Sequence, residues 1–96
     1  MAADLGAIRE RSKGIFGNRY MLEVCAAMSD VTDRTNLRAL IGDSGLSPSV
    51  YFGPLHRLEE AGLLSATLRP GDDRRERWYR PHSSSLWMAA QELVSE

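Results

Sequence analysis

Apolar residues recur at helical spacing in several stretches of the chain. Over 3–16 and 19–30 they return every third or fourth position, which predicts two amphipathic helices. A short third helix is expected around 37–41. A last helix is expected over 83–96, where serines precede an apolar stripe.

A fourth helix begins near Ser47, which is suited to cap it, but a glycine and Pro54 stand at its centre. A proline inside a helix removes one hydrogen bond and costs roughly 3 kcal/mol. Tyr51, Leu55 and Leu58 nevertheless keep helical spacing across the proline. We therefore expect one helix, bent at Pro54, rather than two separate helices.

The pattern changes after this helix. Residues 63–70 and 75–81 alternate as strands do and contain β-favouring residues. The sequence "GDDR" between them has the composition of a hairpin turn. The predicted fold is mainly α with a small β-hairpin, in the order of four helices, the hairpin and a last helix.

Length and composition limit the classes of protein. The 96 residues predict a single domain over 1–96, with an N-terminal helix in 1–17, a core in 18–82 and a C-terminal helix in 83–96. The single cysteine allows no internal disulfide and no cysteine cluster for zinc, which fits a reducing cytosol. The start of the chain lacks a long apolar core, so we expect a cytoplasmic protein with neither signal peptide nor membrane span.

No motif for catalysis stands out. His56 and His82 are far apart in sequence and have no cysteine or aspartate at metal or triad spacing. Glu59 and Glu60 are more plausible as surface charges than as an acid/base pair, and no phosphate-binding glycine loop is present. We expect no enzymatic activity, no metal site and no cofactor. The sequence leaves open whether the protein binds a small-molecule effector.

Two short helices joined by a turn that contains glycine and followed by a hairpin are the parts of a winged helix-turn-helix. The sequences "LSPS" at 46–49, "RLEEAGL" at 57–63 and "WY" at 78–79 resemble motifs of the MarR-like, PadR-like and ArsR-like transcriptional regulators. The resemblance covers roughly 18–82. It departs from the family pattern at 81–82, where proline and histidine replace leucine and threonine.

The resemblance implies a regulator that binds double-stranded DNA, with a recognition helix at 47–61 in the major groove and a wing at 65–80 on the backbone or minor groove. The outward face of this helix has no Asn, Gln or Lys, so bidentate readers of bases are scarce. The wing is rich in arginines suited to phosphates. The candidate DNA-binding residues are Arg38, Ser47, Ser49, Phe52, Gly53, His56, Arg57, Arg74, Arg75 and Arg77.

Structural alternatives accompany these assignments. The wing arginines can pair with Asp72, Asp73 and Glu76, while Phe52 can pack on a neighbour and His56 can be a solvated surface residue. The formal net charge of -1 is unusual for a protein that binds nucleic acid. An alternative function is a winged-helix protein-interaction module with weak or no specific DNA binding.

The first and last helices carry apolar stripes that exceed what a lone small domain needs. Related regulators pair through such terminal helices, which sets two recognition helices one DNA turn apart. We therefore expect a homodimer; the alternative is that both helices fold back onto the monomer core. The candidate interface residues are Leu5, Ile8, Ile15, Phe16, Leu86, Trp87, Ala90, Leu93 and Val94.

Overall fold

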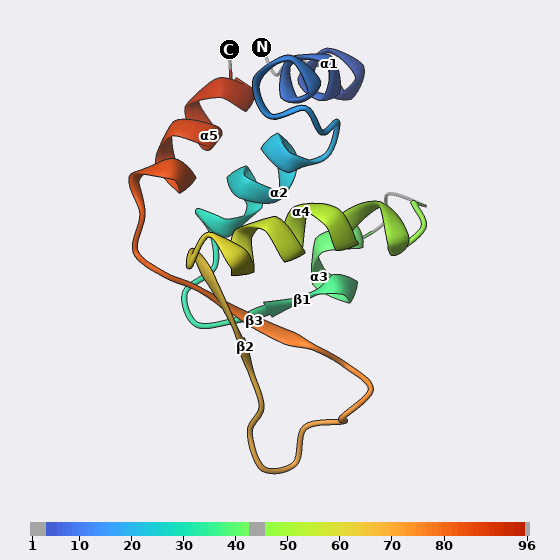
Figure 1. Cartoon of the computed structure of the whole chain (residues 1–96), viewed down its shortest axis with the longest axis vertical. Coiled ribbons are helices and arrows are strands. Elements are labelled where there is room, and N and C mark those ends of the chain that lie inside the picture. Colours follow the sequence, from blue (N-terminus) through green and yellow to red (C-terminus); the bar gives the residue numbers. More distant parts are fainter. Residues whose placement is uncertain (1–3, 43–45, 96) are drawn as a thin grey trace. The chain divides into compact units, whose positions relative to one another are not determined.

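The computed structural model describes residues 4–42 and 46–95, and this part of the chain is mainly α with one small sheet (Figure 1). The chain divides into two compact units. The helical unit is Met1–Asp30 with Ser84–Glu96, and the sheet unit is Val31–Ser83. The elements are α1 (Leu5–Phe16), α2 (Met21–Met28), β1 (Thr35–Asn36), α3 (Leu37–Ile41), α4 (Ser49–Glu60), β2 (Leu64–Thr67), β3 (Trp78–Pro81) and α5 (Ser85–Ser95).

In the helical unit, α1 and α5 both pack on α2. Six of the eight residues of α2 are buried, and α5 contributes Trp87 and Ala90 to the buried set. The guanidinium of Arg11 in α1 donates to the carbonyl of Leu93 in α5 at 2.6 Å. This bond links the two outer helices of the unit directly.

A buried serine joins α1 to α2. Ser12 lies at a position that shares its helix face with apolar residues, and its side chain is fully buried. Its hydroxyl donates to the carbonyl of Asn18 at 2.5 Å and accepts from the amide of Leu22 at 2.9 Å. One side chain thus satisfies two backbone groups at the turn between the helices.

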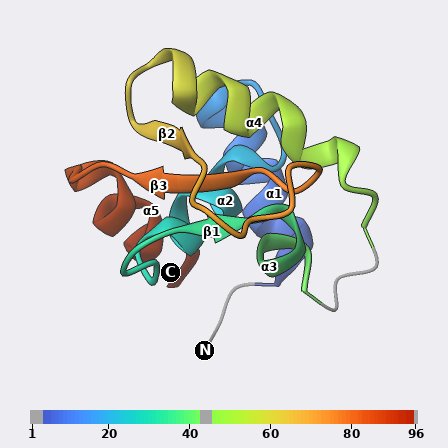
Figure 2. The ribbon, with the colours of Figure 1, turned by 90° about the horizontal axis from the view of Figure 1, so that it is seen from below.

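In the sheet unit, β3 lies between β1 and β2, and both pairings are antiparallel (Figure 2). Tyr79 pairs with Thr35 on one side and with Ala66 on the other. The strand β1 was not predicted, because two residues inside a polar turn carry no alternating pattern of their own. Pairing with β3 is what makes them a strand.

The predicted strands at 63–70 and 75–81 are too long, because β2 ends at Thr67 and β3 begins at Trp78. Residues 68–77, called the wing loop from here on, connect them. Asp72 turns this loop back on itself: its carboxylate accepts from the amide of Arg69 at 2.8 Å, and its own amide donates to the carbonyl of Arg69 at 3.0 Å. These local bonds replace the ladder that a longer hairpin would need.

A single α-helix, α4, runs through Pro54, as the apolar spacing predicts. Tyr51, Leu55 and Leu58 are buried together with Pro54, so packing compensates the hydrogen bond that proline cannot make. The predicted cap at Ser47 is wrong. The N-cap is Pro48, one residue later, and the hydroxyl of Ser47 accepts only a long hydrogen bond of 3.4 Å from the amide of Ser49.

Candidate nucleic-acid interface

The outward face of α4 and the wing loop border one hollow of about 510 Å³ in the sheet unit. From α4 it is lined by Phe52 and His56, and from the wing loop by Arg75 and Arg77. These are four of the residues that the sequence marks as candidates for DNA contact. The full lining is Leu37, Phe52, His56, Glu59, Arg75, Arg77 and Tyr79.

A second hollow of about 640 Å³ shares three of these lining residues and extends toward α3. It brings Arg38, the candidate from α3, to the same two arginines of the wing loop. The turn between α3 and α4, in which glycine is expected, includes residues 43–45, which lie outside the described part of the chain. The lining is Leu37, Arg38, Ile41, Gly42, Pro48, Asp73, Arg75, Glu76 and Arg77.

Each arginine that lines these hollows lies beside a carboxylate. The side chains of Arg38 and Arg75 are 88% and 90% exposed, so their ion pairs are surface pairs that water screens. The sequence suggests, as an alternative to DNA contact, that a wing arginine pairs with Asp73. Arg75 of the same loop makes this pair. The pairs are Arg75 with Asp73 at 3.1 Å, Arg77 with Glu59 at 3.5 Å and Arg38 with Glu76 at 4.0 Å.

The polar candidates on α4 and just before it also have partners inside the chain. The hydroxyls of Ser47 and Ser49 lie 3.0 Å apart, and His56 lies 3.1 Å from the carboxylate of Glu60 one turn later. Phe52 is 55% exposed, which leaves more than half of its ring area in water.

The remaining candidates are exposed. Gly53 and Arg57 lie at the surface of α4, and Arg74 lies at the surface of the wing loop. Within the described residues, Arg74 has no ion pair. No carboxylate of the described residues therefore neutralises its charge through an ion pair.

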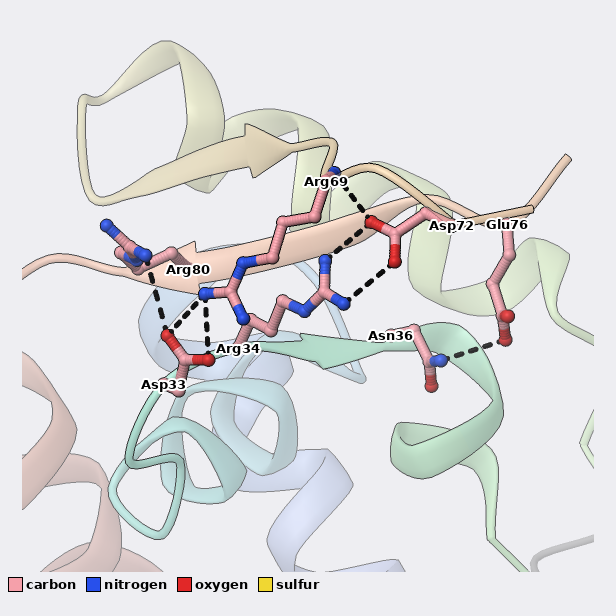
Figure 3. A network of polar contacts seen from close by, with 7 residues as sticks. All are labelled: Asp33, Arg34, Asn36, Arg69, Asp72, Glu76 and Arg80. Atoms are coloured by element: carbon pink, nitrogen blue, oxygen red, sulfur yellow. Dashed lines mark hydrogen bonds and ion pairs between the residues drawn. The ribbon is translucent and has the colours of Figure 1, made fainter. Parts of the chain in front are cut away.

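A residue that the sequence analysis missed fixes the base of the wing. The guanidinium of Arg34 lies 4.2 Å from the centre of the Trp78 ring. It also makes two hydrogen bonds to Asp72, at 2.7 and 2.9 Å, which Figure 3 shows. These bonds hold the pKa of Asp72 at about 2, and the amide of Arg69 contributes in the same direction. The only signal in the sequence is an arginine next to a polar turn, which is too common to single out.

Two further contacts tie the same region together (Figure 3). Asp33 accepts from Arg69 at 2.8 Å and lies 3.5 Å from Arg80, and the hydrogen bond from Arg69 is the main reason that the pKa of Asp33 is lowered. The amide of Asn36 donates to Glu76 at 2.8 Å. The loop is thus held to the segment around β1 from three positions: Arg69, Asp72 and Glu76.

The candidate dimer residues all belong to the helical unit. Leu5 and Ile15 in α1 are 45% and 53% exposed, whereas Trp87 and Ala90 in α5 are already buried in a single chain. A contact between two chains would therefore use the exposed positions of α1 more readily than these two. The other five candidates are partly exposed: Ile8, Phe16, Leu86, Leu93 and Val94.

The described residues contain neither a cluster of metal ligands nor a membrane-spanning helix. No group of three or more His, Cys, Asp or Glu side chains could hold a metal ion in residues 4–42 and 46–95. None of the helices that the structure describes is long and apolar enough to cross a membrane.

Comparison with known proteins supports the fold. No protein-family model matches the sequence, and no curated protein matches it. Among solved structures, a transcriptional regulator of the MarR family from Rhodococcus sp. RHA1 is similar, with a TM-score of 0.59 and 21% identity. The match covers 94% of this chain and 61% of that one, so this chain spans less than two thirds of its length. The predicted winged-helix fold, and the resemblance at the level of the fold, are confirmed.

Proposed function

We propose that the protein is a DNA-binding transcriptional regulator. In this proposal α4 enters the major groove and the wing loop contacts the phosphate backbone or the minor groove. The observation that carries it is the hollow in which Phe52 and His56 of α4 face Arg75 and Arg77 of the wing loop. The fold that the chain shares with a MarR-family regulator supports the same function.

The distribution of charge supports a DNA partner despite the net charge of -1. The sheet unit carries eight arginines against seven acidic residues, whereas the helical unit carries four basic residues against six acidic ones. Exposed ion pairs contribute little stability, so a phosphate can replace a carboxylate beside a guanidinium at small cost. Release of counterions from the DNA then favours the exchange.

A titration of labelled random-sequence duplex DNA by fluorescence anisotropy, over a range of salt, tests the proposal. We expect binding at low salt. The logarithm of the binding constant should fall linearly with the logarithm of the salt concentration, and the slope of this line reports the number of phosphate contacts. The double variant Arg75→Ala/Arg77→Ala should reduce the slope by about 2, one for each lost phosphate contact. Lys13→Ala/Arg19→Ala, which removes two exposed positive charges from the helical unit, is the matched control.

The absence of binding at low salt would overturn the DNA-binding function. If the salt slope changes equally in the Lys13→Ala/Arg19→Ala variant, total charge rather than the wing loop sets the affinity.

We further propose that the regulator acts as a homodimer through α1 and α5. The exposed apolar side chains of Leu5 and Ile15 support this contact. Sedimentation of the wild type should give a dimer, and Leu5→Glu/Ile15→Glu should give a monomer. Leu68→Glu, which changes a more exposed leucine in the wing loop, should stay dimeric. A monomeric wild type would contradict the proposal.

A protein-interaction module is the second candidate function. Two observations favour it: carboxylates lie beside Arg38, Arg75 and Arg77, and an exposed phenyl ring such as that of Phe52 is also suited to an apolar protein surface. The salt titration separates the two functions. A chain that binds no duplex at low salt, yet is folded, would favour the second.

A further inference from the structure

The outward face of α4 offers little hydrogen-bonding capacity for reading bases. Ser49, Phe52 and His56 follow one another along this face at helical spacing. The hydroxyl of Ser49 already contacts Ser47, and the ring of His56 already contacts Glu60. Between 49 and 60 there is no Asn, Gln or Lys to make bidentate bonds to a base edge, and Arg57, which follows His56 directly, lies toward the flank of this face.

Phe52 is the large apolar side chain at the middle of this face, and it is 55% exposed. The next residue, Gly53, is exposed and has no side chain, so a partner can approach the helix closely beside the Phe52 ring. Arg75 and Arg77 line the same hollow as Phe52. An exposed apolar side chain with arginines beside it suits a ligand that combines phosphates with an apolar group.

Resting on the proposed DNA-binding function, we propose that Phe52 reads sequence by contact with the C5-methyl group of thymine in the major groove. The methyl group is the apolar feature that distinguishes thymine there, and phenylalanine is among the side chains that contact it. The arginines position the helix on the backbone, and Phe52 supplies the discrimination. The protein should therefore prefer sites in which thymine methyl groups lie under the middle of α4.

Replacement of thymine by uracil tests this directly, because it removes the methyl group and leaves the phosphates and the pairing edges in place. A random duplex library is first selected for binding to the wild type. The selected duplexes are then synthesised with thymidine, deoxyuridine or 5-bromodeoxyuridine, whose bromine has about the size of a methyl group. Affinities are measured for the wild type, Phe52→Ala and Phe52→Leu.

We expect the wild type to lose about fourfold in affinity for each contacted methyl group that uracil removes, and bromouracil to restore the affinity. Phe52→Ala should bind the thymine and uracil duplexes equally, while Phe52→Leu should keep part of the preference. Met88→Ala, which truncates an exposed apolar residue of α5, should behave as the wild type. Because Phe52 is exposed, its truncation should leave folding intact, which thermal unfolding checks.

Equal affinity of the wild type for the thymine and uracil duplexes would overturn this inference and leave the DNA-binding function standing. The same holds if Phe52→Ala keeps the full preference, or if bromouracil fails to restore binding. If the wild type selects no duplex at all, the DNA-binding function fails and the inference fails with it.

Discussion

Arg34 and Asp72 are joined by two parallel hydrogen bonds of 2.7 and 2.9 Å, although they are separated by 38 residues in the chain. The side chains are only 15% and 10% exposed, and the guanidinium also lies on the Trp78 ring. The planar fork of arginine matches a carboxylate and stacks on an aromatic face at the same time, which a lysine cannot do. This pair ties the wing loop to the residue that precedes β1.

The first prediction concerns the stability of this pair. Arg34→Ala and Asp72→Asn should each lower the melting temperature by several degrees, because each leaves a partner without its charge-assisted bonds. The melting temperature of Arg34→Lys should lie between theirs and that of the wild type. Lysine keeps the positive charge but cannot make two parallel hydrogen bonds to the carboxylate. Thermal unfolding by circular dichroism measures the change.

A double variant provides the control. If the two side chains act through each other, Arg34→Ala/Asp72→Asn should destabilise by less than the sum of the single changes. If the losses of unfolding free energy in the two single variants simply add up in the double variant, the interaction between Arg34 and Asp72 contributes no stability.

The second prediction concerns pH. The pKa of Asp72 is about 2 in the folded chain against an ordinary 3.8, so the unfolded chain takes up its proton first as pH falls. The stabilisation is therefore fully present above about pH 4 and is lost as the pH falls from about 4 to about 2. The lowered pKa values of Asp33 and Asp73 act in the same direction.

Urea unfolding over a series of pH values measures this dependence. Asp72→Asn should be less stable at neutral pH and should lose less stability on acidification than the wild type. Arg34→Ala should show the same flattening, because it removes the main cause of the lowered pKa of Asp72. Parallel curves for wild type and both variants would contradict the assignment.

The third prediction concerns the buried hydroxyl of Ser12. Ser12→Ala leaves the carbonyl of Asn18 and the amide of Leu22 without this partner inside the protein, which should cost about 1–3 kcal/mol of unfolding free energy. Ser95→Ala is the matched control, because that hydroxyl is exposed at the end of α5. Urea unfolding should show the control within about 0.5 kcal/mol of the wild type. An equally small effect of Ser12→Ala would show that the turn finds other partners.

The fourth prediction concerns Asp73 and rests on the proposed DNA binding. Asp73→Asn removes the carboxylate beside Arg75 and should raise the affinity for duplex DNA by up to about fivefold. Glu92→Gln in α5 changes the net charge by the same amount in the helical unit. Anisotropy titration at low salt should separate the two variants. Equal gains would mean that net charge, not the release of Arg75, controls affinity.

Much of the fold follows from local pattern. The spacing of Tyr51, Leu55 and Leu58 predicts a continuous α4 through Pro54, and the structure confirms it. The predicted hairpin lies at the right place, but its strands are too long. The alternation of apolar and polar residues does not reveal that Asp72 forms a turn with Arg69 between the strands. Ser47 was assigned as a cap on residue type, whereas capping depends on backbone geometry that the type does not determine.

The sequence by itself determined the helices, the position of the hairpin between α4 and α5, and the residues that face outward on α4, because these depend on side chains close together along the chain. Only the tertiary structure decided that β1 joins the sheet, that Arg34 holds Asp72, and that Arg77 lies beside Glu59 of α4. These contacts link residues that are distant in sequence. In the sequence, any arginine could pair with any nearby or distant carboxylate. Only the folded backbone decides which arginine lies beside which carboxylate.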